Sequence, residues 1–406
     1  MAAANQEART ARWAVSAIFF LTGVGTANWA VRIPALQERL SLTAGQLGLA
    51  LLGVSAGAIV SMPLAGRLVA RHGSRPVTRV AALAFALALA LPPLAPSFVT
   101  LAAALAVLGL TNGMLDVAMN AQAASVQQHH RQPIMSRIHA MYSLGGLAGA
   151  AIGGRLAAHD VRPSVHMAGV ALALAVASFF LGMRMLPASA DAAPEQSPTA
   201  RFTRPLVALG VVAFCVLFGE GAMTNWSAVY LREVVGAGPG LAAAGFAAFS
   251  LTMATGRALG DALTTRFGAE RLVRAGGTLA ALGGALAIAV PQPWAVIVGF
   301  GAIGAGLSSV FPLVLAAASR TPNVVPGAAI AAVSMCGYSG LLAGPPLIGA
   351  VASVLTLRGG LAIVSLTSFV VALLARTLHT KSSARAESDR REVAPAAVNQ
   401  AAHHAA

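Results

Sequence analysis

Twelve apolar runs of about twenty residues divide the sequence, and this repetition limits the chain to one class of fold. A helix of that length spans the hydrocarbon core of a bilayer. The runs cover residues 13–35, 44–70, 77–95, 98–126, 134–158, 166–186, 205–231, 240–260, 272–290, 294–318, 327–353 and 359–378. The sequence therefore predicts an all-α polytopic membrane protein with twelve transmembrane helices.

Composition excludes the other broad classes. Hydrophobic residues make up 57% of the chain and charged residues 10%, whereas a soluble domain carries about 25% charged residues. An ordinary soluble enzyme, a disordered chain and a disulfide-rich secreted scaffold are therefore excluded. The two cysteines, Cys215 and Cys336, lie inside apolar runs with no spacing partner, so we expect no metal site from them.

A stretch rich in Ala, Pro and Ser separates six runs from the other six. We expect a cytoplasmic N-terminus at 1–12, a first six-helix bundle at 13–186 and a cytoplasmic linker at 187–204. A second bundle should follow at 205–378, and a polar, disordered cytoplasmic tail at 379–406.

The two halves resemble each other in sequence. Identical residues recur at nearly one offset: Leu68, Arg71 and Gly73 with Leu263, Arg266 and Gly268; Gly145, Leu147, Ala148 and Gly149 with Gly340, Leu342, Ala343 and Gly344; Gly109 with Gly304; and Asn28-Trp29 with Asn225-Trp226. A parallel repeat of six helices is typical of transporters with a substrate site between the halves, near the bilayer midplane.

The net charge of +14 has a topological interpretation. If the N-terminus is cytoplasmic, 21 of the 27 basic residues fall on the cytoplasmic side, with Arg257 counted among them. The remaining six are Arg32, Arg39, Arg155, Arg162, Arg232 and Arg358. Basic residues concentrate in cytoplasmic loops, so we expect both termini inside and no nucleic-acid partner.

Two acids lie within apolar runs, where a charge costs about 3 kcal/mol or more. Asp116 lies in the fourth run and Glu220 near the middle of the seventh. Each is either a structural ion-pair or hydrogen-bond partner between helices, or a group that exchanges protons during transport. Asn112, Asp116 and Asn120 share one helical stripe, which favours the second reading for Asp116. Such a stripe would line a wet cavity in which amides bind hydroxyl groups.

Aromatic and basic residues near these acids have two readings each. The Asn28-Trp29 and Asn225-Trp226 pairs either bind a solute, with the indole stacked on a sugar face, or belong to packing and interfacial belts. Arg32 either reaches the headgroups or pairs with an intramembrane acid. His139 is either structural or titratable. Tyr142 and Tyr338 are further candidates for the solute site.

The chain resembles the major facilitator superfamily from about Trp13 to Leu378. The family's loop signature, G-x-L-x-D-R-x-G-R-R, corresponds to Gly66 through Arg75, including Arg71 and Gly73. Ala70 replaces the family's aspartate, so the resemblance makes Asp261 the better carrier of a loop latch. In the second half, Asp261, Arg266 and Gly268 would take the corresponding gating roles.

Within that superfamily, Gly113 through Asn120 resembles the fourth helix of the fucose permease group of sugar–proton symporters. The resemblance implies a proton-coupling role for Asp116. Overall the chain is most similar to bacterial inner-membrane proteins grouped with the rhizopine-locus membrane protein, which implies an inner-membrane location.

These patterns favour a proton-coupled transporter of a small polar solute, for example a sugar or sugar derivative, working as a monomer by alternating access. We expect no cofactor, with the proton gradient as energy source. The alternative is proton-driven efflux of a drug or metabolite. Gly145 through Gly154 resembles an exporter motif with Ala150 in place of proline, but Leu101 through Gly113 lacks the exporters' arginine. A non-transporting receptor or a membrane enzyme fits poorly, because the loops are short and no nucleophile–base pair is evident.

Overall fold

The computed structural model describes residues 2–130, 134–187, 203–321, 324 and 326–378. Its elements are α1 (Ala2–Arg39), α2 (Ala44–His72), α3 (Ser74–Ala88), η1 (Pro92–Leu94), α4 (Phe98–His130), α5 (Met135–Ala158), α6 (Pro163–Gly182), α7 (Arg204–Glu233), α8 (Pro239–Phe267), α9 (Ala269–Ala289), α10 (Pro293–Leu307), α11 (Val310–Ala318), α12 (Pro326–Val354), α13 (Leu357–Leu374) and η3 (Ala375–Leu378). Most of the predicted linker and all of the predicted tail lie outside the described residues.

The prediction of an all-α polytopic membrane protein is confirmed. Among the described residues, ten helical segments are long and apolar enough to cross a bilayer. Two more helices, α5 and α8, are long enough but less apolar. The run expected at 294–318 is interrupted at Ser308 and Ser309, so that α10 and α11 together form one crossing and the described crossings number twelve.

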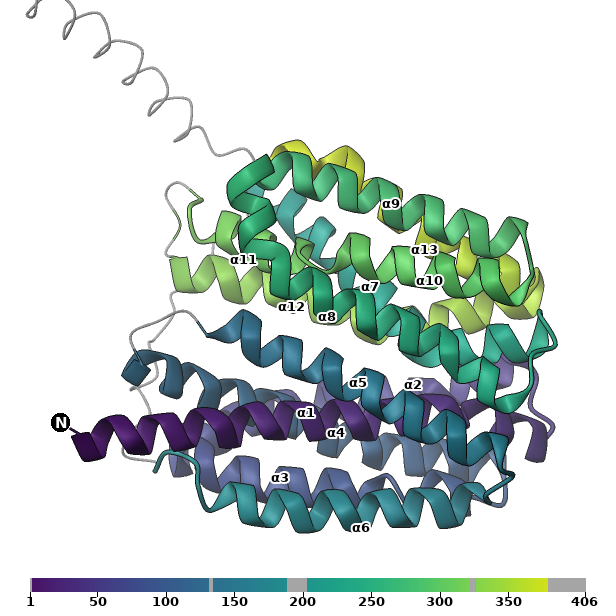
Figure 1. Cartoon of the computed structure of the whole chain (residues 1–406), viewed down its shortest axis with the longest axis horizontal. Helices are drawn as coiled ribbons and strands as arrows, with labels where there is room; N and C mark the ends of the chain where they lie inside the picture. The colour runs from purple at the N-terminus through teal and green to yellow at the C-terminus, as the bar shows by residue number, and fades with distance from the viewer. Residues whose placement is uncertain (1, 131–133, 188–202, 322–323, 325, 379–406) are drawn as a thin grey trace, which may run out of the picture.

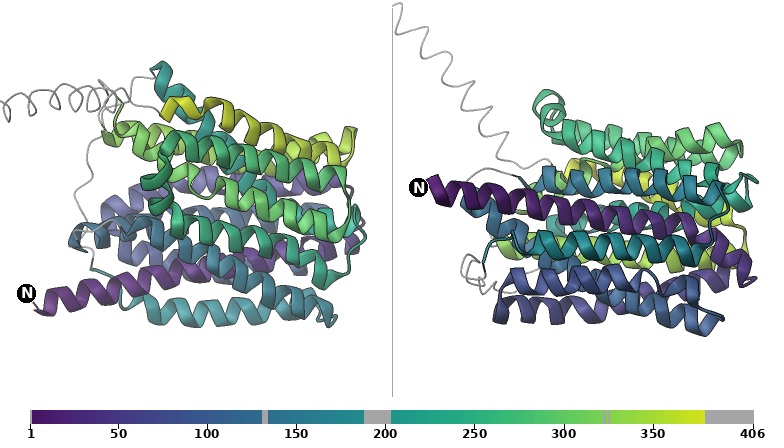
Figure 2. Two further views of the ribbon diagram at one scale, coloured as in Figure 1. Left: turned by 45° about the horizontal axis from the view of Figure 1, so that its top comes forward. Right: turned by 60° about the horizontal axis from the view of Figure 1, so that its bottom comes forward.

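The helices form two bundles that lie side by side, α1 to α6 in one and α7 to α13 in the other (Figure 1, Figure 2). At their boundary α5 packs on α8, and α2 packs on α12. These two pairs are equivalent under the sequence repeat.

The halves approach each other most closely at the end of the molecule far from the N-terminus. There the start of α2 meets the end of α12, where an added Cβ on Gly48 would lie 2.7 Å from the Cα of Gly349. The end of α5 meets the start of α8 at Gly154 and Ala243 in the same way. Toward the N-terminal end α5 and α8 diverge (Figure 1). The molecule is thus closed between the halves at one end.

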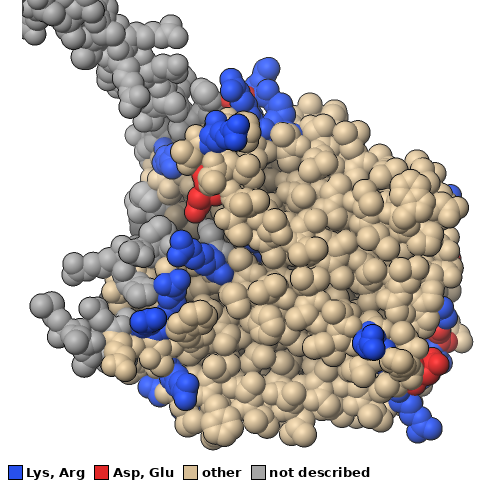
Figure 3. All heavy atoms as spheres, viewed as in Figure 1, with Lys and Arg blue, Asp and Glu red and all other residues tan. Residues whose placement is uncertain are grey.

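On the face drawn in Figure 3, basic side chains gather toward the end where the N-terminus lies, and a broad band with few charged residues separates them from a smaller charged group at the opposite end. We call the first of these the arginine-rich end. It includes Arg71 and Arg75 beside the α2–α3 turn, and Arg266 and Arg271 beside the α8–α9 turn.

Candidate functional site

A cavity of about 230 Å³ lies between the two halves, at the centre of the molecule. Its polar wall residues come from both halves: Thr22, Thr26, Ser55, Asn112, Asp116, His139, Tyr142 and Ser143 from the first, and Glu220, Thr224, Asn225, Ser250, Arg257 and Tyr338 from the second. Its apolar wall includes Trp29, Phe246, Phe249 and Phe311. A cavity of this volume has room for a small solute.

Asp116 lies in this cavity with electrically neutral partners. Tyr338 on α12 donates a hydrogen bond to its carboxylate from the opposite half. On α4 the Asn120 amide donates to the Asp116 carboxylate at 3.2 Å and to its backbone oxygen at 2.8 Å. Asn112, one turn earlier, lines the cavity, while Asn120 lies outside the cavity wall. Of the three residues in the predicted stripe, Asn112 and Asp116 therefore line the cavity, and Asn120 hydrogen-bonds Asp116 from outside the wall.

Glu220 is held differently, in an ion pair. Arg257 on α8 donates from Nη2 to the Glu220 carboxylate at 2.7 Å and from Nη1 to the Ser143 hydroxyl at 2.9 Å. The two charged side chains are only 10% and 16% exposed. Because Ser143 belongs to α5, the guanidinium connects the two halves. The structural reading of Glu220 as an ion-pair partner between helices thus describes its contacts here.

Two tyrosines in the cavity wall interact with both of these acids. Tyr142 on α5 hydrogen-bonds Thr26 of α1, and both Tyr142 and Tyr338 lie within electrostatic reach of Asp116 and Glu220. His139, also in the cavity wall, packs edge-on against Phe19 with ring centroids 5.2 Å apart. The two acids, the two tyrosines and Arg257 thus form one polar cluster across the boundary.

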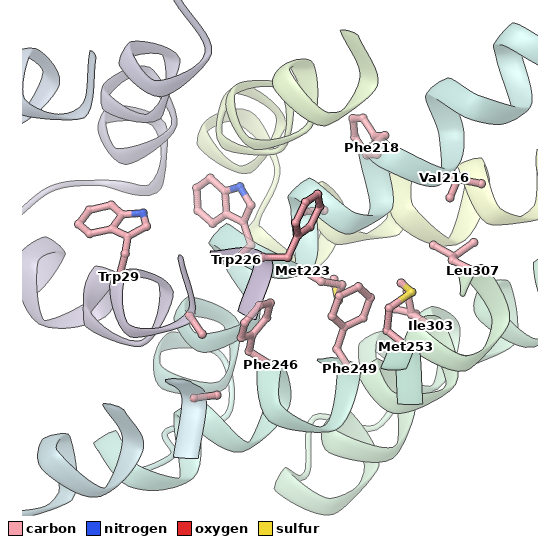
Figure 4. Close-up of a cluster of buried hydrophobic side chains, with 14 of the residues drawn as sticks. Trp29, Val216, Phe218, Met223, Trp226, Phe246, Phe249, Met253, Ile303 and Leu307 are labelled. Atoms are coloured by element: carbon pink, nitrogen blue, oxygen red, sulfur yellow. The ribbon is translucent and has the colours of Figure 1, made fainter. Parts of the chain in front are cut away.

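The repeated Asn-Trp pairs do not occupy equivalent surroundings. Trp29 and Asn225 line the cavity, whereas Asn28 and Trp226 do not. Trp226 is fully buried and donates from its indole nitrogen to the Pro345 carbonyl at 3.1 Å. Figure 4 shows it on α7 near Met223 and Phe246, with Trp29 on α1 opposite. One member of each pair therefore lies outside the cavity wall in this structure.

Asn28 belongs to a buried chain that also contains Arg32. The Arg32 Nε donates to His166 Nδ1, and His166 Nε2 meets Asn28 Oδ1, each at 2.7 Å. Asn28 then donates to the Val24 carbonyl at 2.8 Å. Arg32 is buried, and it pairs with no acid among the described residues. Both expectations for Arg32, headgroup contact and an acidic partner, are therefore wrong, because a histidine on α6 accepts its hydrogen bond.

The two loop signatures form matching turns at the arginine-rich end. Gly73 ends α2 with φ of 85° and Gly268 ends α8 with φ of 80°, a conformation that favours glycine. Arg71 and Arg266 lie in the last turns of those helices. Gly66 lies on α2 with open space beside it. Asp261 is exposed and forms no ion pair among the described residues.

Sequence reasoning missed the role of Arg257, which it placed on the cytoplasmic side. The residue lies inside α8 and reaches into the cavity. Its position within the run 240–260 was the available signal, since an intramembrane arginine calls for an acidic partner. Ser55 was also missed; it donates at 2.6 Å to the Leu342 carbonyl. That carbonyl lacks its helical partner because Pro346 has no N–H.

The described residues contain no group of three or more His, Cys, Asp or Glu side chains that could hold a metal ion. Cys215 and Cys336 are free thiols. The cavity wall thus combines hydroxyls, amides, the carboxyl group of Asp116 and the Glu220–Arg257 ion pair, and these groups can bind a solute reversibly.

Comparison with known proteins agrees with the fold and the repeat. The model of the Major Facilitator Superfamily matches residues 15–323 and 209–403. An uncharacterized MFS-type transporter of Yersinia pestis is 33% identical over 89% of this chain and 94% of its own length. Membrane protein MosC of Rhizobium meliloti is 31% identical over 88% of each chain. A bacterial homologue of the lysosomal transporter Spinster, solved inward-facing and unoccupied, superposes with a TM-score of 0.69 at 14% identity, over 92% of this chain and 98% of its own.

Proposed function

Because the chain belongs to the major facilitator superfamily and is a membrane transporter rather than an enzyme, we propose that it moves one small polar solute together with a proton by alternating access. The observation that carries this proposal is Asp116, a carboxyl group in the central cavity whose hydrogen-bond partners among the described residues, Tyr338 and Asn120, are neutral. It can gain or lose a proton without breaking an ion pair.

The cavity suits a polyhydroxyl solute, such as a sugar or sugar derivative. Hydroxyl groups both donate and accept hydrogen bonds, which matches the amides of Asn112 and Asn225 and the hydroxyls around them. Trp29 offers a flat apolar face on the same wall. Tyr142 and Tyr338 would contact the solute from opposite halves, so that the solute senses both.

Charge balance supports coupling to protons. Glu220 and Arg257 neutralise each other, so the cavity carries one negative charge when Asp116 is ionised and none when it is protonated. Moving an uncompensated charge through the bilayer interior is expensive. The protein with bound solute would therefore change between its outward-open and inward-open states with Asp116 protonated. The proton gradient would supply the energy, and no cofactor would be needed.

The opening and closing would take place between the two bundles. In the closed end, Arg232 donates to Glu38 at 2.6 Å, and Gln37 donates to Glu233, in both cases between α1 and α7. The arginine-rich end would face the cytoplasm. In this proposal both termini would lie on the cytoplasmic side of a bacterial inner membrane, and the described conformation would be inward-facing. Nothing in the cavity needs a second copy of the chain, so we propose a monomer.

Proton-driven efflux is the alternative, and the aromatic wall of Phe246, Phe249 and Phe311 favours it. The two functions differ in the gradient they use. A thermal-shift screen of purified protein against sugars, polyols and drugs would identify a solute, which is then followed in proteoliposomes. Symport predicts accumulation when the outside is acidic. Accumulation that requires an acidic inside would identify an antiporter and contradict the proposal.

A further inference from the structure

We propose that a groove on the lipid-facing side of the second half holds one acyl chain of an anionic phospholipid, with the phosphate bound by Arg266 and Arg271. The groove has a volume of about 540 Å³ and is formed by α8, α9, α10 and α11. Its walls include Leu251, Thr255, Leu259 and Leu263 on α8, and Leu272 and Leu279 on α9.

The groove matches hydrocarbon in chemistry and length. Its few hydroxyl groups are satisfied by backbone oxygens: Thr255 bonds Leu251, Ser308 bonds Ala305 and Ser309 bonds Gly256. No free donor or acceptor is therefore needed from an occupant. From Leu251 to Leu263 the α8 wall extends roughly 18 Å, which is close to one leaflet of a bilayer core about 30 Å thick.

Two arginines, Arg266 and Arg271, lie next along the α8 and α9 walls at the arginine-rich end, just beyond the wall residues Leu263 and Leu272. On α8, Leu259, Leu263 and Arg266 lie at i, i+4 and i+7, and so share one face. On α9, Arg271, Ala275 and Leu279 lie at i, i+4 and i+8. The turn at Gly268 brings these two faces together. A chain lying in the groove would thus end between two exposed guanidinium groups.

The surrounding charges favour an anionic headgroup. Arg274 pairs with Glu270 at 2.5 Å, and Arg266 lies over the Phe267 ring, 5.3 Å from its centroid. Arg271 and Arg320 also lie at this end of the second half. Together with Arg266 and Arg274 they make four arginines, compared with two carboxylates, Asp261 and Glu270. Guanidinium groups bind phosphate in a bidentate manner, so an excess of arginine at a leaflet surface attracts anionic lipids.

Occupancy would matter for transport because the groove and the cavity share walls. On α8, Gly256 lines the groove and its neighbour Arg257 lines the cavity. On α11, Val310 lines the groove and Phe311 lines the cavity. The break at Ser308 and Ser309 lies in this wall. An acyl chain in the groove would support the helix segment that carries Phe311.

Native mass spectrometry of the purified full-length protein tests the site, with phosphatidylglycerol and phosphatidylethanolamine of the same acyl chains as probes. We expect one phosphatidylglycerol to bind more tightly than phosphatidylethanolamine. The double variant Arg266→Gln/Arg271→Gln should weaken that binding about ten-fold. Thr255→Phe, which fills the groove from an exposed position, should remove it while leaving the charges in place.

Arg71→Gln is the matched control, because Arg71 occupies the equivalent position in the first half. It should leave the binding unchanged. Equal binding of both lipids, full binding by Thr255→Phe, or the same loss in Arg71→Gln would each overturn the proposal. A solute-binding assay on the same variants keeps this test separate from the transport function, since none of the four substituted residues lines the cavity.

Discussion

The two acids in the central cavity come from different halves and are held by opposite chemistry. Asp116 of the first half receives hydrogen bonds from Tyr338 and Asn120, which are neutral. Glu220 of the second half receives its hydrogen bond from Arg257, which is charged. Neutralising Glu220 would leave a guanidinium unpaired in a largely buried position, whereas neutralising Asp116 leaves no charge behind.

This difference assigns distinct tasks to the two halves. The ion pair of Glu220 with Arg257 connects α7 to α8, and Arg257 also hydrogen-bonds Ser143 of the first half. The Asp116 region is free to change its charge within the transport cycle we propose. The tryptophans follow the same division, because Trp29 of the first half lines the cavity and Trp226 of the second is packed.

The largest expected effect comes from breaking the buried ion pair. Glu220→Gln or Arg257→Gln alone should destabilise the protein by about 3 kcal/mol or more, since each leaves a buried charge uncompensated. Unfolding of the purified protein in detergent, followed by heat or denaturant, measures this. The double variant Glu220→Gln/Arg257→Gln should recover most of the loss. A double variant as unstable as the sum of the two single changes would mean that the residues act independently.

A smaller effect should separate the two tryptophans. Trp226→Phe removes the indole bond to Pro345 and should cost about 1–2 kcal/mol of stability, with solute affinity unchanged. Trp29→Phe should instead weaken solute binding, because Trp29 lies in the cavity wall. Isothermal titration of both variants with the identified solute compares them. Equal losses of affinity would show that Trp226 also reaches the solute.

The smallest effect concerns an ion pair of the same chemistry at the closed end. Arg232 and Glu38 are 34% and 55% exposed, and exposed pairs contribute less than about 1 kcal/mol. Glu38→Gln should therefore leave the melting temperature nearly unchanged while increasing the population open at that end. Spin labels on the two halves would report the distance distribution. A large loss of stability would mean that this exposed pair contributes as much as the buried Glu220–Arg257 pair, and would contradict the prediction.

The sequence predicted the fold well because a bilayer imposes a strict length of about twenty apolar residues on each crossing. It did not predict the break at Ser308 and Ser309, which depends on close contacts with Gly256 and Gly260 on another helix. The stripe containing Asp116 followed from helical spacing alone. Its partner Tyr338 could not be predicted, since packing between the halves decides which side chains meet.

The error over Arg257 has a similar cause. The position of Arg257 within an apolar run indicated an acidic partner in the membrane, but which acid it meets follows only from the packing of α8 against α7, where Glu220 lies. The identical Asn-Trp dipeptides likewise gave no sign that Trp29 lies in the cavity wall and Trp226 does not. Local sequence defines the helices, whereas contacts between helices define the site.

The central claim is that Asp116 carries the coupled proton, and proteoliposomes containing Asp116→Asn test it most directly. We predict that this variant still exchanges labelled for unlabelled solute at equilibrium but no longer accumulates solute when a pH gradient is imposed. Asp160→Asn is the control, since Asp160 is exposed and its φ of 54° suits asparagine. Uphill accumulation by Asp116→Asn at the rate of this control would contradict the account.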